Sequence, residues 1–347
     1  MKRKLGICTR YTRQGASSRL RYHLYASALE EAGFEAEFHP FFTERYLQNL
    51  YSGGGKSRLL AAAALAKRLA LAPLLPERLL IEYELLPELP YSVESLLLGH
   101  RRYVLNFDDN VWEKYTERPR LAEKFDELCR HAAGVIAAND FLLERIRPLN
   151  AVTIKIPTVV DLEEYPPAAE KFPRFTVAWI GTPVTYAYLE QQADALRAME
   201  QAAEFELLVI AGKQLEARAI PGVSMRFVDW SAETEAELLG RSHVGIMPLP
   251  EEDPFARGKS AFKLIQYRAA GIPAIASPVG ENRTMIVPGE TGFLARTPAE
   301  WAAALRTLHD DEAERLRMGR RARELAAECS LRKYAPILTG FLEKTLG

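Results

Sequence analysis

The chain has 347 residues, of which 48% are hydrophobic and 26% charged, as is typical of a soluble globular protein long enough for two domains. Its formal net charge of -1 gives no overall field that favours nucleic acid, and its six histidines and three cysteines show no metal-ligand spacing. No apolar run approaches the roughly 20 residues of a membrane span, and the apolar part of the N-terminus is too short for a signal peptide. We therefore expect a cytoplasmic protein without a metal site.

Apolar runs typical of β-strands alternate with helical stretches through the first half of the chain, which is the pattern of βαβ units around a parallel sheet. Pro157 ends this series, so we expect residues 1–160 to form one Rossmann-like domain. The predicted strands are Lys4–Cys8, Glu35–Phe38, Leu79–Tyr83, Tyr103–Phe107, Gly134–Ala137 and Thr153–Ile156.

The segment TRQGASSRLRYH follows the first predicted strand and opens a helix. Gly15 and Ser17 allow the backbone to approach a ligand closely, and Arg19 and Arg21 are fork-shaped donors to anions. The segment lacks the full dinucleotide-binding fingerprint, so its glycine-rich character alone does not identify a ligand.

The segment Lys56–Leu80 is a Leu/Ala-rich helix that carries several lysines and arginines. One interpretation is a buried crossover helix with exposed basic ends. The alternative is a helix that touches an anionic membrane surface.

Carboxylates follow two of the predicted strands. Asp108 and Asp109 come directly after Tyr103–Phe107, and Glu84 follows Leu79–Tyr83. Paired carboxylates at a strand end can bind sugar hydroxyls, orient a nucleophile or act as a base, whereas the structural alternative is a helix cap with a solvated neighbour. Glu84 is a further candidate acceptor for hydroxyls.

A segment rich in proline and charge, residues 161–174, is typical of a linker. A second series of strands follows it, so we expect another Rossmann-like domain over residues 175–330. Ligands of open α/β sheets bind at the carboxyl ends of strands, and two such sheets imply a cleft. We also expect a C-terminal helix within residues 331–347 that crosses back to the first domain. The predicted strands of the second series are Thr176–Ile180, Leu207–Ala211, Ser224–Phe227, Val244–Met247, Pro273–Ser277 and Gly292–Leu294.

Several strand ends of the second series carry residues suited to an anion or a base. Gly181 and Thr182 repeat the order of strand, glycine and small hydroxyl residue, and Lys213 follows the next strand. Trp230 stands in a loop before a helix, where an indole can stack on a base.

The stretch GKSAFKLIQYRAAGIPAIASPVGEN places two lysines at the start of a predicted helix. The N-terminus of a helix is electropositive, so Lys259 and Lys263 there indicate a missing anion such as a diphosphate. Ser260 is the expected N-cap, residues 261–270 carry the helical pattern, and Gly271 suits the position after its end. Gln266 lies on the face of Lys263. A turn containing Gly280, Glu281 and Asn282 closes the stretch.

The chain carries, in this order, the motifs GASSRLR, EYELLPE, NFDDNVW, IPTVVD, WIGTPVTYAYLE, the run GIMPLPEEDPFARGKSAFKLIQYRAAGIPAIASPVGEN and PGETGFLA. Together these motifs resemble those of the GT-B glycosyltransferases of family 4, also called group 1. The resemblance spans nearly the whole chain and is most specific in the C-terminal run. It implies two Rossmann-like domains with parallel sheets facing a cleft. It further implies transfer of a hexose-type sugar from a nucleoside-diphosphate sugar, with retention and without a bound metal or cofactor. Relatives often build surface polysaccharides or lipid-linked glycans at the inner face of the cytoplasmic membrane.

The resemblance also implies roles for single residues. The donor is held mainly by the second domain, where Lys263 binds the diphosphate and the helix beginning near Asn282 faces the sugar or phosphate. Gln266 stands where most of the family has the second glutamate of a paired-glutamate motif, and Gly258 stands at the position of the first. The implied donor-binding residues are Gly181, Thr182, Lys213, Trp230, Lys259, Lys263, Gln266, Gly280, Glu281 and Asn282.

The acceptor is seated on the first domain, and Asp108 occupies a place where many relatives carry histidine. We expect Lys259 and Lys263 to stabilise the charge that grows on the β-phosphate. A front-face path, in which the phosphate takes the acceptor proton, is one mechanism, and Asp108 as a positioning group or base is the other. The implied acceptor-binding residues are Gly15, Ser17, Arg19, Arg21, Glu84 and Asp109.

Two other functions share this architecture. A sugar-nucleotide epimerase binds the same donor but needs further acid/base carboxylates around the sugar. A catalytically silent nucleotide-binding partner protein would fit the replaced glutamates.

Overall fold

A computed structural model describes residues 3–52, 55–166 and 170–347, apart from the side chain of Lys213. The chain forms two compact units. Unit 1 contains residues 1–159, 258–260 and 331–347, and unit 2 contains residues 160–257 and 261–330. The chain therefore passes between the units four times. The cleft expected from the sequence concerns the mutual placement of the units and stays a prediction.

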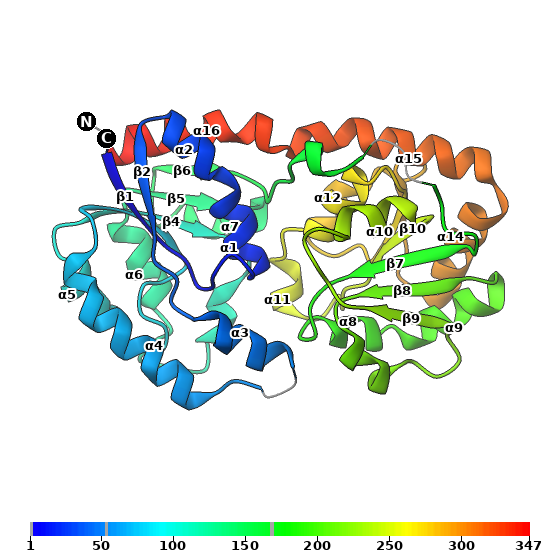
Figure 1. Ribbon diagram of the computed structural model, residues 1–347, viewed down its shortest axis with the longest axis horizontal. Helices are drawn as coiled ribbons and strands as arrows, with labels where there is room; N and C mark the ends of the chain where they lie inside the picture. The colour runs from blue at the N-terminus through cyan, green and yellow to red at the C-terminus, as the bar shows by residue number, and fades with distance from the viewer. Residues whose placement is uncertain (1–2, 53–54, 167–169) are drawn as a thin grey trace. The chain divides into compact units, whose positions relative to one another are not determined.

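Unit 1 is built on a six-stranded parallel sheet with the order β2-β1-β3-β4-β5-β6 (Figure 1). All six strands predicted in the first half are confirmed to within one residue at each end. The central strands β3, β4 and β5 are mainly apolar and buried, as expected for parallel strands covered on both faces, whereas the edge strands β2 and β6 are more polar. The strands are β1 (Arg3–Cys8), β2 (Phe34–Phe38), β3 (Arg78–Glu82), β4 (Arg102–Phe107), β5 (Gly134–Ala137) and β6 (Thr153–Lys155).

Helices cover both faces of this sheet (Figure 1). Alternate residues of each strand point to opposite faces, so Leu80 and Val104 pack with α2 and α16, whereas Ile81 and Leu105 pack with α5, α6 and α7. The helices are α1 (Ala16–Arg21), η1 (His23–Tyr25), α2 (Ala26–Glu31), α3 (Glu44–Tyr51), α4 (Arg58–Leu71), η2 (Ala72–Leu74), α5 (Tyr91–Leu98), η3 (Val111–Lys114), α6 (Lys124–His131), α7 (Asp140–Ile146) and α16 (Leu331–Leu346).

Unit 2 is built on a second parallel sheet of six strands with the order β12-β11-β10-β7-β8-β9. The six strands predicted in the second half are also confirmed. They are β7 (Thr176–Ile180), β8 (Glu206–Ile210), β9 (Met225–Val228), β10 (Val244–Met247), β11 (Ala274–Ala276) and β12 (Gly292–Leu294).

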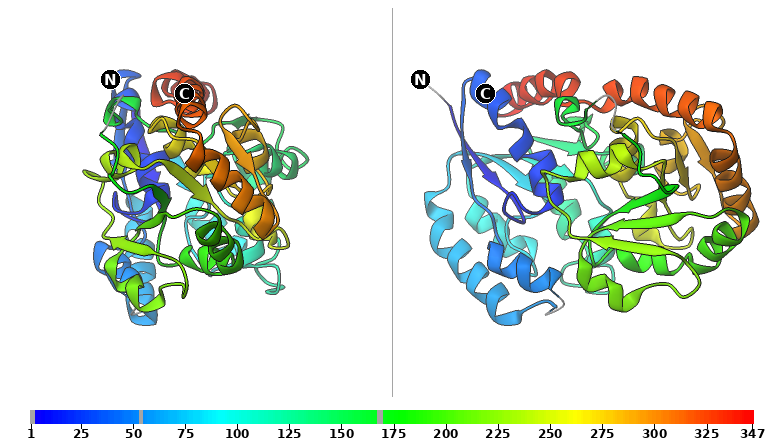
Figure 2. Two further views of the ribbon diagram at one scale, coloured as in Figure 1. Left: turned by 90° about the vertical axis from the view of Figure 1, so that its right-hand side faces the viewer. Right: turned by 45° about the vertical axis from the view of Figure 1, so that its right-hand side comes forward.

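The views of Figure 2 show helices on both faces of the second sheet as well. Ala178 and Ile180 of β7 pack with α10 and α12, and Val177 and Trp179 pack with α9 and α14. The helices of unit 2 are η4 (Leu162–Glu164), α8 (Tyr186–Glu190), α9 (Ala193–Ala202), η5 (Lys213–Arg218), α10 (Glu235–Arg241), α11 (Pro254–Arg257), α12 (Phe262–Ala269), α13 (Asn282–Met285), α14 (Pro298–Asp310), α15 (Glu312–Ala326) and η6 (Ala327–Cys329).

The start of α12 differs from the prediction. Ser260 is not its N-cap, because the helix begins at Phe262 and Ala261 occupies the cap position in the left-handed conformation, with φ 52°. Ser260 instead accepts a hydrogen bond from Thr158 within unit 1, at 3.3 Å between the two hydroxyl oxygens. The predicted end of the helix is confirmed, since Gly271 follows Ala270 with φ 68°.

The expected linker, residues 161–174, packs within unit 2 as far as it is described. Tyr165 is buried, and the backbone N–H of Phe172 donates to the carbonyl of Arg241 at 2.9 Å. Residues 167–169 of this linker lie outside the described part of the chain. Among the described helices, none is long and apolar enough to cross a membrane.

Candidate functional site

The strand orders place one topological switch point in each sheet, where ligands of such folds bind beyond the carboxyl ends of the strands. In unit 1 this point lies between β1 and β3, and in unit 2 it lies between β7 and β10. Of the predicted site residues, Gly15, Glu84, Gly181 and Thr182 lie in the loops that follow β1, β3 and β7, and the others lie in α1 and α12 or follow neighbouring strands.

Asp108 lies at the carboxyl end of β4 and is 8% exposed. Its Oδ2 accepts a hydrogen bond from Ser17 Oγ at 2.8 Å, and its Oδ1 accepts one from the Tyr83 hydroxyl. The structure thus brings together the predicted residues Asp108 and Ser17, and it adds Tyr83, which has the left-handed φ of 61°.

Glu82, the last residue of β3, is a member of this cluster that the sequence analysis missed. It is 2% exposed, and its Oε2 accepts hydrogen bonds from the Arg10 backbone N–H and from Ser18 Oγ, both at 2.7 Å. Burial and the nearby charge of Asp108 raise the pKa of Glu82 to about 7. The sequence did contain a signal for Glu82, because it is a charged residue at the end of an apolar strand. The carboxyl end of that strand lies on the same edge of the sheet as Asp108.

Arg21 has a structural role in place of the expected contact with an acceptor. It is 3% exposed, its Nε and Nη2 donate to Asn106 Oδ1, and its Nη2 also donates to the Ile156 carbonyl at 3.1 Å. Arg19 is half-buried on the same helix. Gly15 precedes α1, and an added Cβ there would lie 2.5 Å from Tyr11 Cβ, so this position requires glycine for packing.

Glu84 is likewise structural, in contrast to the acceptor contact expected from the sequence. Its side chain is 1% exposed and forms ion pairs with Lys124 at 2.7 Å and Lys114 at 3.0 Å. Its carboxylate also accepts from the Tyr115 hydroxyl at 3.0 Å. Although burial opposes ionisation, the charges of Lys124 and Lys114 lower the pKa of Glu84. This network leaves no surface of Glu84 for a substrate hydroxyl.

The short segment 258–260 belongs to unit 1, where its backbone is bound by Asn139. The Asn139 Nδ2 donates to the carbonyls of Gly258 at 2.9 Å and Lys259 at 3.3 Å. The Lys259 ammonium lies 3.8 Å from Asp109 Oδ1. An added Cβ at Gly258 would lie 2.4 Å from Asn110 Cβ, so the glutamate that the family pattern has here does not fit without a shift.

Lys263 lies in the first turn of α12, in unit 2, as predicted. Its ammonium is 5.3 Å from the ring centroid of Trp179, a cation–π distance. Trp179 also explains Gly181, because an added Cβ there would lie 2.4 Å from Cη2 of the indole. The structure therefore brings Lys263 and Gly181 to the same strand end, whereas Lys259 belongs to the other unit.

The backbone of Gly181 and Thr182 does not offer the expected donors for an anion. The Gly181 N–H donates to the Ile210 carbonyl at 3.1 Å, and the Thr182 N–H donates to Thr185 Oγ1 at 3.0 Å. A phosphate would have to displace the Thr185 hydroxyl to reach the Thr182 N–H.

Two of the remaining predicted donor-binding residues are buried or hydrogen-bonded within the protein. Gln266 is 2% exposed. Trp230 donates its indole N–H to Glu235 Oε2 at 2.5 Å, so its polar edge is held by the protein. Lys213 begins η5, but its side chain lies outside the described part of the structure.

The turn of residues 280–282 is held by the buried side chain of Asn282. Asn282 is 1% exposed, and its Nδ2 donates to the Ser277 carbonyl at 3.0 Å. Gly280 has φ 51°, and an added Cβ would lie 2.4 Å from the Arg257 carbonyl oxygen, so only glycine fits. Glu281 is the N-cap residue of α13. Within the ranges that the structure describes, no group of three or more His, Cys, Asp or Glu side chains is arranged to hold a metal ion.

Residues 174–311 match the family described as Glycosyl transferases group 1. Among curated relatives, the D-inositol 3-phosphate glycosyltransferase of Corynebacterium glutamicum (strain R) is 44% identical over 64 residues, or 18% of this chain and 15% of the relative. The protein of the same description from Corynebacterium efficiens is 41% identical over 68 residues, or 19% of this chain and 16% of the relative. The matched segments thus span less than a fifth of these relatives.

Solved structures resemble the whole chain in fold. HepE of Anabaena in complex with UDP has a TM-score of 0.68 at 14% identity, covering 99% of this chain and 100% of its own. Sucrose-phosphate synthase from Thermosynechococcus elongatus has a TM-score of 0.68 at 16% identity, covering 99% of each chain. The GT-B fold expected from the sequence is therefore confirmed.

Proposed function

We propose, from the match of residues 174–311 to the family described as Glycosyl transferases group 1, that the protein is a glycosyltransferase. The proposed reaction moves a hexose-type sugar from a nucleoside-diphosphate sugar to a hydroxyl of a glycan or lipid-linked acceptor. Transfer proceeds with retention and without a metal. The HepE structures support a uridine donor as the first candidate, because that protein was solved with UDP and with UDP-glucose.

The observation that carries this proposal is the position of Lys263. Its ammonium lies at the N-terminal turn of α12 and against Trp179, whose indole also adjoins Gly181, at the switch point of the sheet that contains the family match. A cation, a helix N-terminus and a glycine at such a point are the parts of a diphosphate site. As the glycosidic bond of the donor breaks, Lys263 stabilises the charge that grows on the β-phosphate.

A thermal-shift series with UDP, GDP, ADP and TDP tests this site. A ligand that binds only the folded state raises Tm in proportion to its excess over Kd. We expect one nucleoside diphosphate to raise Tm in the wild type but not in Lys263→Ala. The control is Lys333→Ala, which removes an exposed lysine of α16 in unit 1 and should keep the shift. A shift that survives Lys263→Ala would refute the diphosphate assignment.

On the acceptor side, Asp108 is the proposed positioning group or base. Ser17 and Tyr83 hold its two carboxylate oxygens in place. Asp108→Asn preserves the volume and removes the base, so we expect kcat to fall by about 10²-fold or more while the Tm shift with nucleotide remains. If donor turnover were unchanged in this variant, the acceptor proton would leave by the front-face path to the phosphate.

The α4 apolar face supports peripheral contact with an anionic membrane. We define this face by exposed apolar residues of α4 and η2, among which Leu59 is 84% exposed, Leu69 39% and Leu74 76%. It points away from the core, and cationic residues flank it, so a surface with acidic headgroups would complement both its apolar and its charged parts. The face consists of Leu59, Ala62, Ala63, Ala66, Leu69 and Leu74, flanked by Arg58 and Lys67.

Liposome flotation tests this contact. We expect the wild type to float with vesicles containing phosphatidylglycerol and not with pure phosphatidylcholine, and we expect Leu59→Ser/Leu74→Ser to stay at the bottom. Leu316→Ser is the matched control, because Leu316 is 43% exposed but lies on α15 of unit 2. Equal flotation of both variants would exclude the α4 apolar face as the contact.

A further inference from the structure

Two carboxyl groups of unit 1 lie around one pair of adjacent serines. Ser18 Oγ is 2.7 Å from Glu82 Oε2, and Ser17 Oγ is 2.8 Å from Asp108 Oδ2. Glu82 ends β3 and Asp108 follows β4, and these strands are hydrogen-bonded neighbours with Glu82 opposite Asn106. Ser18 is fully buried, so the two carboxyl groups interact through a medium that screens their charges poorly.

The surroundings of Glu82 favour its neutral form. Its Oε1 is buried and has no hydrogen-bond partner among the described residues, so an ionised carboxylate would leave one oxygen without a donor. Both groups that donate to Oε2, the Arg10 backbone N–H and the Ser18 hydroxyl, are uncharged.

The charged and titratable groups around Glu82 do not compensate a charge on it. The Arg10 guanidinium is paired with Glu84, at 3.7 Å, and the Arg21 guanidinium is bound to Asn106 and the Ile156 carbonyl. Tyr83 after β3 and Tyr22 at the end of α1 interact with both carboxyl groups, while Asp109 acts on Tyr83 and Arg21 acts on Tyr22. Arg10 reaches Glu82 through its backbone N–H.

Glu82 also positions the first turn of α1, which carries Ser17. Ser18 Oγ, which donates to Glu82, accepts from the Tyr11 N–H at 3.1 Å. Glu82 therefore binds the loop after β1 at Arg10 and the start of α1 at Ser18, and the adjacent Ser17 donates to Asp108.

We propose that Glu82 and Asp108 form a coupled carboxyl pair that holds one proton, and that Glu82 is the positioning residue that sets the affinity of Asp108 for the acceptor proton. This inference rests on the proposed glycosyl transfer. In the reaction the acceptor oxygen bonds to the anomeric carbon, the bond from that carbon to the β-phosphate oxygen breaks, and the nucleoside diphosphate leaves with the electron pair. The hydroxyl proton passes to Asp108. When Glu82 is ionised, its negative charge beside Asp108 favours this uptake.

A thermodynamic cycle tests the pair without any need for activity. The free energy of unfolding is measured in urea from pH 5 to 9 for the wild type, Glu82→Gln, Asp108→Asn and the double variant. We expect the wild type to lose stability relative to Glu82→Gln as the pH rises through the titration of Glu82. Removal of the like charge in Asp108→Asn should move the midpoint of that loss to lower pH by at least about half a unit.

The control for the cycle is Asp126→Asn, which removes a carboxylate of the same unit that accepts from the Trp112 indole at 2.7 Å. This change should leave the midpoint in place. If Asp108→Asn also leaves it in place, the two groups are not coupled and the inference is wrong. Should Glu82→Gln fail to fold, the midpoints of the wild type and Asp108→Asn still decide the question.

A pH–rate profile tests the catalytic part. The rate of UDP-glucose hydrolysis, with water as acceptor, is measured for the wild type, Glu82→Gln and Glu82→Asp. We expect the wild-type kcat to rise as Glu82 ionises, Glu82→Gln to lose this rise while UDP still raises Tm, and Glu82→Asp to restore part of it. An unchanged profile in Glu82→Gln would overturn this inference and leave the proposed function standing. The absence of both nucleotide binding and turnover would instead overturn the proposed function, and the unfolding cycle would still decide whether the pair exists.

Discussion

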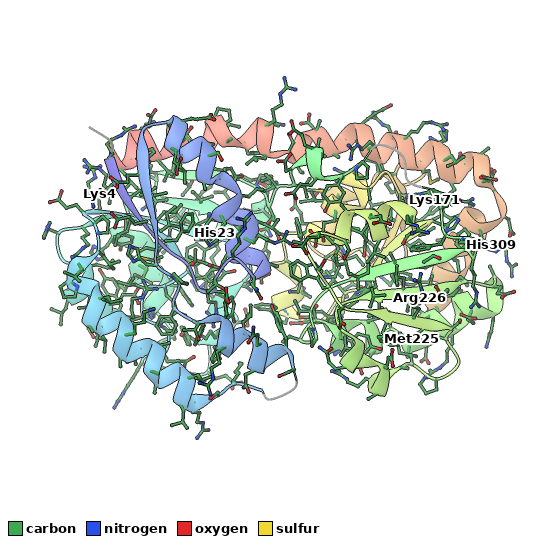
Figure 3. The ribbon with its side chains drawn as sticks, viewed as in Figure 1. Lys4, His23, Lys171, Met225, Arg226 and His309 are labelled. Carbon is green, nitrogen blue, oxygen red and sulfur yellow. The ribbon has the colours of Figure 1, made fainter. Side chains whose placement is uncertain are left out.

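His243 is a residue whose surroundings fix its charge state. Its Nδ1 accepts from the Thr176 N–H at 3.0 Å, and its ring stacks on Phe175 with the ring centroids 4.8 Å apart. Burial first, and then the positive charges of Arg315 and Lys171, lower the pKa of His243 to about 4. Figure 3 labels Lys171 together with His309, whose charge acts in the same direction.

This pKa predicts acid sensitivity. Because the folded state binds a proton on His243 less readily than the unfolded state, stability present above about pH 6.5 is lost as the pH falls towards 4. We expect His243→Asn, which keeps an acceptor near the Thr176 N–H, to show a flatter loss of unfolding free energy between pH 6.5 and 4. The control is His131→Asn, since the His131 side chain is 59% exposed. Parallel curves for the wild type and His243→Asn would contradict this prediction.

Arg21 allows a structural role to be separated from substrate binding. Arg21→Lys keeps the charge but loses the two-pronged bond to Asn106 and the bond to the Ile156 carbonyl. We expect the free energy of unfolding to fall by roughly 2–4 kcal/mol. The acceptor KM of the folded fraction should stay within about twofold. A large rise in KM without a loss of stability would restore the substrate contact predicted from the sequence.

The sequence predicted the place of Asp108 because carboxyl ends of neighbouring parallel strands share one edge of the sheet. It could not predict the fates of Arg21 and Glu84. Their partners come from far along the chain: Ile156 for Arg21, and Lys114 and Lys124 for Glu84. Whether an arginine or glutamate faces a ligand or a buried partner depends on that long-range packing, which local pattern does not encode.

At the scale of elements, the same substitution is expected to have opposite effects at two glycines. Gly181→Ala would place a Cβ 2.4 Å from the Trp179 indole and 2.8 Å from Thr185 Oγ1, and so would displace the ring against which Lys263 lies. Gly340 lies within α16, and nothing lies within 4 Å of an added Cβ. We therefore expect Gly340→Ala to stabilise the protein by roughly 0.5–1 kcal/mol.

Chemical denaturation and nucleotide titration together check this pair. Gly181→Ala should weaken the binding of a nucleoside diphosphate by about tenfold or more and lower the unfolding free energy by roughly 1–3 kcal/mol. Gly340→Ala should leave nucleotide affinity unchanged. Equal nucleotide affinity in both variants would show that the position of Trp179 does not matter to the site.

The strands were predictable because buried parallel strands are continuous apolar runs, which the chain shows in both halves. The beginning of α12 was not. Ser260 has the chemistry of an N-cap, but Thr158 binds its hydroxyl, and Asn139 holds the backbone just before it. A preference worth about 1 kcal/mol for a capping residue is thus overridden by contacts from residues more than 100 positions away.

At the scale of the whole molecule, the last helix completes the core of the first unit. Leu338, Leu342 and Leu346 of α16 are at most 1% exposed and pack in the same core cluster as Leu80 and Val104. The carbonyl groups near its end are also bound, since Arg78 donates to Leu346 at 2.7 Å and Arg102 to Thr345 at 2.7 Å. Unit 1 is therefore assembled from both ends of the sequence together with residues 258–260, and unit 2 from residues 160–257 and 261–330.

A chain that stops at Ser330 tests this division. Burial of the three leucines contributes roughly 5–9 kcal/mol, which is comparable to the whole stability of a domain. We expect unit 1 to be unfolded in the shortened chain, with a smaller cooperative transition left for unit 2.

Nucleotide binding identifies which unit survives. If Lys263 and its neighbours form the diphosphate site, UDP or the nucleotide identified for the full chain should still raise the Tm of the remaining transition, while donor turnover is lost. Leu342→Ala is a milder form of the same change and should lower the unfolding free energy of unit 1 by about 2–5 kcal/mol, whereas Lys333→Ala on the exposed face of α16 should not. A shortened chain with the full wild-type transition would show that α16 is dispensable for the core. Loss of nucleotide binding with unit 2 still folded would instead mean that the donor site requires residues of unit 1, among which Lys259 is the first to test.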